Sequence, residues 1–330
     1  MGKQGAVTRD TQQSRAPQLP EYDVVVVGGG PAGLSAALTL SRARRAVLVI
    51  DNGQPRNAVA DAAHNFLGHD GRPPLELLEL GREEVARYGG RLIAGQVVSA
   101  RREDNGLRLD LADGSTVAGR RLLIATGLSD GLPDVAGMSE RWGRDVLHCP
   151  YCHGWEFQDR ALAVLATGAS AVEQALLWRQ WSSDVMLLLN DTFEPSADDN
   201  RKLAARGIEV MSGKAVRLNI DDDALRGVVL ADGTVVNCDA IALHSWTEPS
   251  LDGLDGIGVE VEQFVVGEHA YGTRVASSSE GSTTVPGVWS AGNVAHPMDQ
   301  VVMAASRGVQ AAIAINADLV DEDTELALAR

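Results

Sequence analysis

Apolar and polar positions are arranged along the chain in two similar units. In the first, the β-branched run Val24–Val27 enters a glycine-rich turn, small and apolar residues compatible with a helix follow, and a second apolar run, 46–50, ends at Asp51. Short apolar runs bounded by turn residues are typical of strands buried on both faces. The order strand, turn, helix, strand predicts a βαβ unit in a parallel sheet.

A second unit of the same kind begins near residue 161. Its pattern predicts a strand over 161–166, a turn containing Gly168, a helix to about Trp181 and a strand over 185–189. The duplication predicts an α/β protein with two Rossmann-like dinucleotide-binding domains, the second inserted into the first. We expect residues 1–21 to be a flexible extension, 22–128 and 246–320 to form the first domain, 129–245 the second, and 321–330 an acidic tail that frays.

The remaining patterns extend both units. Residues 74–88 have helical periodicity interrupted by Gly81, and the stretches 108–119 and 226–243 each contain a strand pair around an Asp-Gly turn. Further strands are predicted over 121–127 and 288–292, and a long helix of small residues over about 300–320.

Composition and charge exclude several classes of protein. The chain has 330 residues and a net charge of -16, and such an acidic surface repels nucleic-acid phosphates and anionic lipid. No apolar run approaches the roughly 18–20 residues that span a bilayer. The N-terminus is polar and lacks the apolar core of a signal peptide, so we expect a cytoplasmic protein with neither nucleic-acid nor membrane partners.

The first glycine turn has the spacing of a dinucleotide-binding motif. Gly28 permits the tight turn, Gly30 lets the backbone approach a pyrophosphate, and Gly33 lets the helix pack against the strand. The pyrophosphate would lie at the helix N-terminus, where free N–H groups favour anions. Asp51, about 20 residues further on, is predicted to accept hydrogen bonds from a ribose.

The stretch His148–His153 holds the close cysteine pair of a chain with 3 cysteines. Cys-x-x-Cys-His is found at c-type haem attachment sites, in zinc sites and in redox dithiols. Haem attachment is disfavoured in a chain that we expect to remain in the cytoplasm. Zinc is disfavoured because no second ligand pair exists, and the remaining cysteine, Cys238, is in a predicted strand.

A redox dithiol fits the motif's local chemistry. Cys149 can precede a short helix in which Pro150 is the first residue. The free N–H groups of that helix's first turn stabilise a thiolate. His153 titrates near pH 6.5 in its unperturbed state and can act as acid and base toward thiols. Other histidines are more typical of loops or the core, although His296 is well placed to line a substrate pocket. Trp178 and Trp181 fit helix packing.

An ordered set of motifs resembles the low-molecular-weight thioredoxin reductases from Tyr22 to Leu319. The set comprises the two dinucleotide motifs, Ala125-Thr126-Gly127 at a strand end, Cys-x-x-Cys in the second domain, and the C-terminal Ala-Gly-Asn-Val turn at 291–294. The resemblance implies FAD on the Gly28 motif, a homodimer, and a cysteine pair that exchanges electrons with the flavin.

The same resemblance implies further flavin contacts. Asn293 stands where the reductases have an aspartate that holds the ribityl chain, and its amide can still accept that hydrogen bond. Gln300 and Val301 would begin a helix whose positive end stabilises the reduced flavin. The positions that match the family's flavin site are Gly53, Gln54, Asn65, Val98, Thr126, Gly127, Gly292, Asn293, Gln300 and Val301.

The chain departs from the reductases where NADPH would bind. The second turn has Ala166 in place of the first glycine, followed by Gly168 and Ala171, and 189–191 read Leu-Asn-Asp where the reductases have a phosphate-binding His-Arg-Arg. Residues 180–200 contain neither Lys nor Arg. A phosphate dianion needs such cations or a helix N-terminus, so we expect no NADPH binding. NADH is less firmly excluded, because an aspartate at 191 can bind a ribose.

With His153 directly after the cysteine pair, the chain is similar to a smaller branch of flavin-dependent dithiol oxidases. These enzymes close disulfides in natural products such as gliotoxin, holomycin and romidepsin. The resemblance implies that Cys149 exchanges with a small-molecule dithiol, Cys152 faces the flavin, and O2 accepts the electrons to give H2O2. Two alternatives stay open: a disulfide reductase for a protein partner, and a flavin-bound redox sensor or resistance protein without turnover.

Overall fold

The structure, a computed structural model, describes residues 21–330, so the N-terminal extension expected over 1–21 lies outside it except for Glu21. A seven-stranded sheet with the order β3-β2-β1-β6-β5-β4, in which β19 also pairs with β6, forms the first unit. Its strands are β1 (Tyr22–Val27), β2 (Val47–Asp51), β3 (Arg91–Ala94), β4 (Val97–Glu103), β5 (Gly106–Leu111), β6 (Thr116–Ile124) and β19 (Val288–Ser290).

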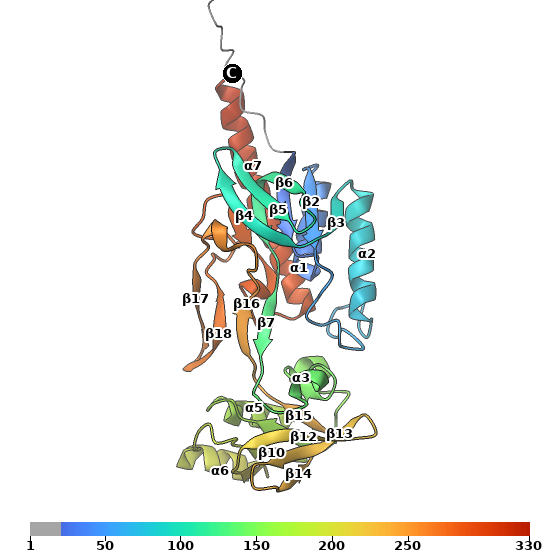
Figure 1. The fold of residues 1–330 in the computed structure, drawn as a ribbon, viewed down its shortest axis with the longest axis vertical. Coiled ribbons are helices and arrows are strands. Elements are labelled where there is room, and N and C mark those ends of the chain that lie inside the picture. Colours follow the sequence, from blue (N-terminus) through green and yellow to red (C-terminus); the bar gives the residue numbers. More distant parts are fainter. Residues whose placement is uncertain (1–20) are drawn as a thin grey trace, which may run out of the picture.

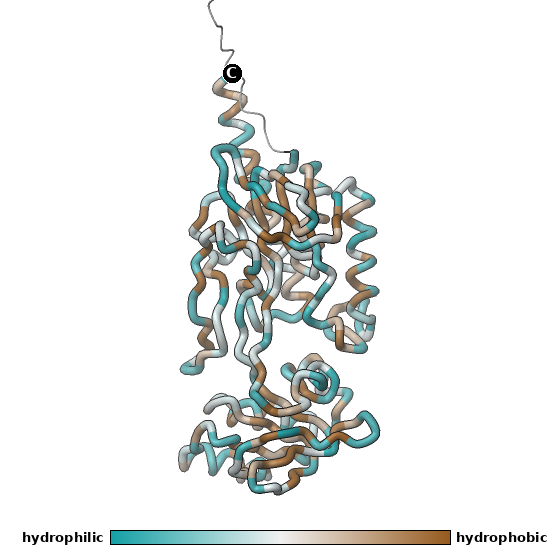
Figure 2. The backbone as a smooth tube through the Cα atoms, viewed as in Figure 1, coloured by the Kyte–Doolittle hydropathy of each residue, from teal (hydrophilic) through white to brown (hydrophobic). Residues whose placement is uncertain are grey.

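Strand β1 is buried on both faces, as its apolar run predicts. Val24 and Val26 pack with the helices α1 (Pro31–Arg42), α2 (Pro74–Arg87) and α7 (Val301–Leu328). Val25 and Val27 pack on the other face, with β4, β5 and the 3-10 helix η1 (Asp255–Ile257). Figure 2 shows apolar residues along the central strands and mixed apolar and polar residues along the helix α2. The sheet therefore has an apolar cluster on each face, and the glycine turn follows directly after the buried end of β1.

The second unit lies between the parts of the first along the chain (Figure 1). Its five-stranded sheet has the order β11-β10-β9-β15-β8, and a three-stranded sheet, β12-β13-β14, adjoins it. The strands are β8 (Val146–Leu147), β9 (Leu162–Leu165), β10 (Val185–Leu188), β11 (Glu209–Met211), β12 (Ala215–Asp221), β13 (Ala224–Leu230), β14 (Val235–Asn237) and β15 (Ala240–Ala242). Its helices are α3 (Met138–Arg141), α4 (Pro150–His153), α5 (Ala171–Trp178) and α6 (Ala197–Ala205). The predicted fold class, two Rossmann-like units, is confirmed.

A four-stranded sheet, β17-β18-β16-β7, was not predicted from the sequence. Its strands are β7 (Leu128–Gly131), β16 (Trp246–Pro249), β17 (Val261–Val266) and β18 (His269–Val275). Strands β7 and β16 pair antiparallel and carry the chain between the two units, as Figure 1 shows. They are the two places where the chain passes from one unit to the other. The second 3-10 helix, η2 (Gly292–Val294), follows β19.

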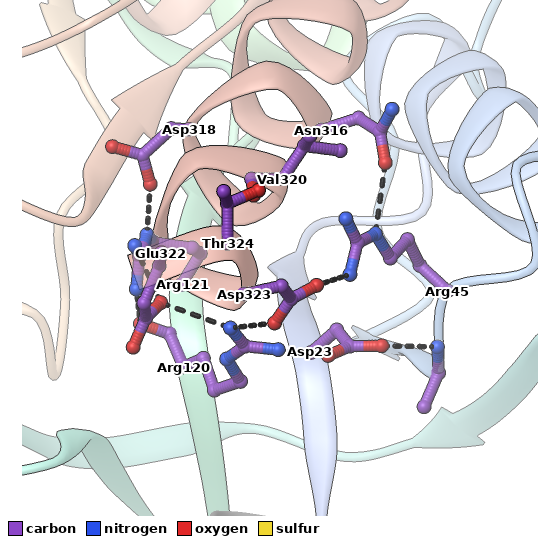
Figure 3. A network of polar contacts seen from close by, with 11 residues as sticks. Asp23, Arg45, Arg120, Arg121, Asn316, Asp318, Val320, Glu322, Asp323 and Thr324 are labelled. Carbon is purple, nitrogen blue, oxygen red and sulfur yellow. Dashed lines mark hydrogen bonds and ion pairs between the residues drawn. The ribbon is translucent and has the colours of Figure 1, made fainter. Parts of the chain in front are cut away.

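The acidic C-terminal segment differs from the expectation that it frays at 321. Helix α7 continues to Leu328, and its carboxylates are paired with arginines of the first sheet (Figure 3). Asp323 accepts from Arg120 and Arg45, each at 2.6 Å, and Glu322 contacts Arg121 at 2.8 Å. The Arg120 side chain is only 6% exposed, so it requires these carboxylates as partners. None of the helices within residues 21–330 has the length and apolar character to span a membrane.

Candidate active site

The glycine turn between β1 and α1 has the geometry of an anion-binding loop. Gly28 has φ +108°, and a Cβ there would lie 2.3 Å from the Ala125 carbonyl oxygen. A Cβ on Gly33 would lie 1.9 Å from the Gly28 oxygen, so the helix can approach the turn only without a side chain. At Gly30, in contrast, a Cβ would meet nothing within 4 Å. The backbone at the start of α1 therefore faces open space, which suits a pyrophosphate.

Asp51 ends β2 beside this turn. Its carboxylate accepts the Gly29 N–H at 3.1 Å and a hydrogen bond from the Arg82 guanidinium at 3.2 Å. A Cβ on Gly29 would lie 2.6 Å from the same carboxylate. These contacts hold the acid at the mouth of the turn, where a ribose bound to the pyrophosphate would reach it.

The turn opens into a cavity of about 690 Å³, within the range of about 300–1,000 Å³ that is usual for ligand sites. The structure brings most of the sequence-predicted site residues together here. Gly28, Gly30, Asp51, Gln54, Thr126, Gly127, Cys149, Cys152, His153, Gly292, Asn293, Gln300 and Val301 all line it. The Thr126 hydroxyl is buried and has no hydrogen-bond partner among the described residues, as expected for a group that faces a ligand.

The start of α7 forms another part of the cavity wall. Gln300 precedes the helix and Val301 begins it, so the helix N-terminus lies at the cavity wall. The Asn293 amide donates to the carbonyls of His296, Pro297 and Asp299, at 2.9–3.1 Å. Its Oδ1 forms no hydrogen bond within residues 21–330, so it can accept one from a ligand. Together with the Gly30 cradle, these residues fit an extended dinucleotide.

Several predicted residues lie elsewhere. Val98 is 51% exposed and does not line the cavity; because side chains alternate along β4, its neighbour Val97 does. Asn65, with φ +62°, donates to the Tyr151 carbonyl at 2.7 Å and so holds the cysteine segment instead of lining the cavity. Gly33 has a packing role beneath the turn. His296 lies outside the lining, which corrects the expectation that it is the best placed of the remaining histidines.

The cysteine pair is presented to this cavity by the single-turn helix α4. Cys149 is its N-cap residue, and Pro150 is its first helical residue, as predicted. Both thiols are free in the structure. The hydrogen bond from Cys152 lowers the pKa of Cys149, and backbone N–H groups of the turn add to this effect. The same hydrogen bond, together with burial, raises the pKa of Cys152. Cys149 is therefore the more nucleophilic sulfur of the reduced pair.

Three histidines surround the thiols. Burial lowers the pKa of His153, and neither of its ring nitrogens has a hydrogen-bond partner among the described residues. Burial also lowers the pKa of His148 to about 3, so this imidazole is neutral. His64 lies between two carboxylates, with Nε2 3.4 Å from Glu156 and Nδ1 3.5 Å from Asp70. The sequence does not distinguish His64 from the other loop or core histidines, because its loop contacts the cysteine segment only through the fold.

Arg56 is a second residue that sequence reasoning missed. Its guanidinium lines the cavity and forms a two-pronged contact with Asp130, Nε to Oδ2 and Nη2 to Oδ1, both at 2.6 Å. Ser245 donates to the same carboxylate at 2.5 Å. Although burial raises the pKa of Asp130, these hydrogen bonds hold it below its usual value. Within residues 21–330, no group of three or more His, Cys, Asp or Glu is arranged to hold a metal.

The second glycine turn opens into a separate cavity of about 480 Å³. Its lining includes Thr167, Gly168, Asn190 and Thr192, but among the described residues no lysine or arginine. Asn190 is engaged by the protein itself: its Oδ1 accepts the Ala215 N–H at 2.9 Å. The β17–β18 connection contributes Glu268 to the wall, and β18 contributes His269 and Tyr271. A phosphate would therefore meet an acidic residue and no cation here.

Comparison with known proteins agrees with this architecture. A family model described as pyridine nucleotide-disulphide oxidoreductase matches residues 22–312. Thioredoxin reductase sirT of Leptosphaeria maculans is 30% identical over 320 residues, covering 92% of this chain and 95% of that protein. The thioredoxin reductase of Aquifex aeolicus is 28% identical, covering 89% and 92%. The crystal structure of HlmI superposes with a TM-score of 0.85 at 44% identity, covering 95% of this chain and 98% of that chain.

Proposed function

The chain belongs to the pyridine nucleotide-disulphide oxidoreductase family, and we propose that within this family it is an FAD-dependent dithiol oxidase. Family membership makes it a flavin-dependent thiol oxidoreductase. The proposed reaction closes a disulfide within a small-molecule dithiol, with O2 as electron acceptor and H2O2 as product. One observation carries the proposal: Cys149 and Cys152 line the same cavity as the Gly28 motif, while the second nucleotide turn lacks any cation.

The cysteines carry the substrate half of the reaction. A substrate thiolate attacks Cys149 of the oxidised pair; the Cys149–Cys152 bond breaks, and Cys152 receives the electron pair. The second substrate thiolate then attacks the substrate sulfur of the mixed disulfide, which releases a cyclic disulfide and the reduced pair. FAD, when bound, accepts the two electrons from the pair and transfers them to O2. In sum, one dithiol and one O2 give one disulfide and one H2O2.

His153 is the proposed acid–base group of this cycle. His153 lines the cavity, neither of its ring nitrogens has a hydrogen-bond partner among the described residues, and its lowered pKa keeps the ring neutral near pH 7. A neutral imidazole can take the proton of the substrate thiol and return it to a cysteine of the reduced pair. The proposed substrate partner is a small-molecule thiol. The active form is proposed to be a homodimer.

The experiment that tests the function compares electron donors. Anaerobic FAD-loaded enzyme is mixed in a stopped-flow instrument with NADPH, NADH and a small dithiol in parallel. We expect the dithiol to bleach the flavin, and admitted O2 to restore the colour with one H2O2 formed per dithiol. NADPH should reduce the flavin slowly or not at all. Reduction by NADPH at tens per second, within the usual range of enzymatic turnover, would show a reductase instead.

A further inference from the structure

Arg56 has no role in the chemistry described so far, yet it lines the same cavity as the two thiols. It lies in the segment between β2 and α2 and lines the cavity together with Cys149 and Cys152. Of all lysines and arginines among the described residues, Arg56 alone lines this cavity. A fixed cation in a partly enclosed site acts strongly on a nearby anion, because little solvent screens it.

The Arg56 guanidinium is held in one orientation by Asp130. Nε and Nη2 bind Asp130, whose side chain is 7% exposed, and Asp130 is fixed in turn by Ser245. Asp130 belongs to β7 and Ser245 directly precedes β16, so the anchor sits on the paired strands that connect the two units. Nη1 forms no hydrogen bond within residues 21–330. The Nε and Nη2 groups of the guanidinium are thus engaged by Asp130, and Nη1 remains free to interact with an anion in the cavity.

The remaining titratable groups around the thiols do not supply a competing cation. Burial lowers the pKa of His148 to about 3 and that of His244, behind it, to about 4. Burial also lowers the pKa of His153, and any positive charge on His64 is offset by the adjacent carboxylates of Glu156 and Asp70. Arg56 keeps its charge at every relevant pH. Its charge also lowers the pKa of both thiols.

We propose that Arg56, oriented by Asp130, is the positioning residue that stabilises the thiolate of the Cys149–Cys152 pair. This inference rests on the proposed function for the steps that it assists. When the disulfide of the pair breaks, the electron pair goes to the Cys152 sulfur, and the guanidinium stabilises that leaving thiolate. When the cyclic product forms, it stabilises the departing Cys149 thiolate in the same way. Asp130 serves to hold the cation, not to move protons.

The test measures ionisation of Cys149 without turnover. In a Cys152→Ser background, the FAD-loaded enzyme is alkylated with iodoacetamide, and the rate is followed against pH to give the apparent pKa. Cys238 contributes no background, because it is buried and its pKa is raised to about 12. Arg56→Gln should raise the apparent pKa of Cys149 by about one unit or more, which lowers alkylation below that pKa about tenfold. Arg56→Lys, which keeps the charge, should restore most of the difference.

Asp130→Asn separates the electrostatic role from a structural one. It breaks the same ion pair but leaves the cation, so the apparent pKa of Cys149 should stay the same or fall. Arg102→Gln, at an exposed position of β4, is the matched control and should change nothing. An unchanged apparent pKa in FAD-containing Arg56→Gln, or equal increases in Arg56→Gln and Asp130→Asn, would overturn the inference. Because no electron acceptor is used, the result is independent of whether the enzyme is an oxidase.

Discussion

Cys149 and Cys152 differ in their surroundings although they lie one helical turn apart. Cys149 accepts the hydrogen bond of the pair and its pKa is lowered, whereas that of Cys152 is raised by the same bond and by burial. In Cys149→Ser the neighbouring thiolate is gone, so Cys152 can ionise at mild pH. If it faces the flavin, a long-wavelength charge-transfer band should appear in the absorbance spectrum. Cys152→Ser should lack the band but trap substrate on Cys149, as mass spectrometry would detect; the reverse pattern would exchange the two roles.

His153 should set the acid limb of the pH profile. Burial lowers its pKa, so the ring stays a neutral base at pH 7 and becomes protonated only below the ordinary value of about 6.5. Activity should therefore fall as the pH decreases through a value below 6.5, and not at neutrality as the sequence alone suggested. His153→Ala should lower turnover about 10²-fold and remove this limb, with FAD retained. His269→Ala, at the second cavity, is the matched control; equal losses in both variants would argue against the role.

The sequence predicts the residues of the site that lie in motifs and misses those that only the fold brings near. The Gly28 turn and the cysteine pair are encoded by local spacing, so they were predicted. Arg56 and His64 lie in a segment between β2 and α2 that has no periodicity, and they reach the cysteines across 80 or more positions of sequence. Val97, not the predicted Val98, lines the cavity, because a shift of one position in a strand turns a side chain to the opposite face.

At the scale of elements, the strands and helices with clear periodicity were predicted, and the connecting sheet was not. Strands β7 and β16 are four residues each and carry polar side chains such as Asp130 and Thr247. Such short strands become defined by pairing with each other and with β18, which sequence periodicity does not reveal. The C-terminal helix was predicted too short for a related reason: its last turns are stabilised by partners about 200 positions away, not by an apolar stripe.

The last turns of α7 should contribute to the stability of the first unit. A chain ending at Val320 lacks Glu322 and Asp323, which leaves the buried Arg120 with Asp23 as its remaining carboxylate partner. Because these carboxylates are partly exposed, we expect a loss of about 1–3 kcal/mol. Thermal unfolding should then occur several degrees lower.

A chain that lacks only residues 326–330 keeps both carboxylates and is the control. The hydrogen bond from Arg45 holds the pKa of Asp323 below its usual value. This contribution is therefore present above the usual carboxyl pKa and is lost as the pH falls through the lowered one. Equal melting temperatures of the two truncated chains at pH 7 would show that the network is dispensable.

At the scale of the whole molecule, the cavity draws its walls from both units. The Gly28 turn, Thr126 and Asn293 belong to the first, and the segment from Trp142 to His153 belongs to the second. Each unit has its own apolar clusters, so each can be expected to retain structure independently. A dinucleotide in this cavity contacts both walls. Its binding energy should therefore stabilise the second unit as well as the first.

Removal of FAD tests this coupling, and Gly30→Asp provides the matched variant. At Gly30 the backbone has φ -77° and a Cβ meets nothing within 4 Å, so a side chain fits. Aspartate is a favourable residue at a helix N-cap, but its carboxylate would occupy the position of the pyrophosphate and repel that anion. Wild-type protein should be yellow with about one FAD per chain, and should unfold in a single calorimetric transition several degrees above that of stripped protein. Gly30→Asp should be colourless and should unfold like the stripped wild type, with or without added FAD. Protein that binds FAD with wild-type affinity despite Gly30→Asp would show that the dinucleotide does not lie on this turn.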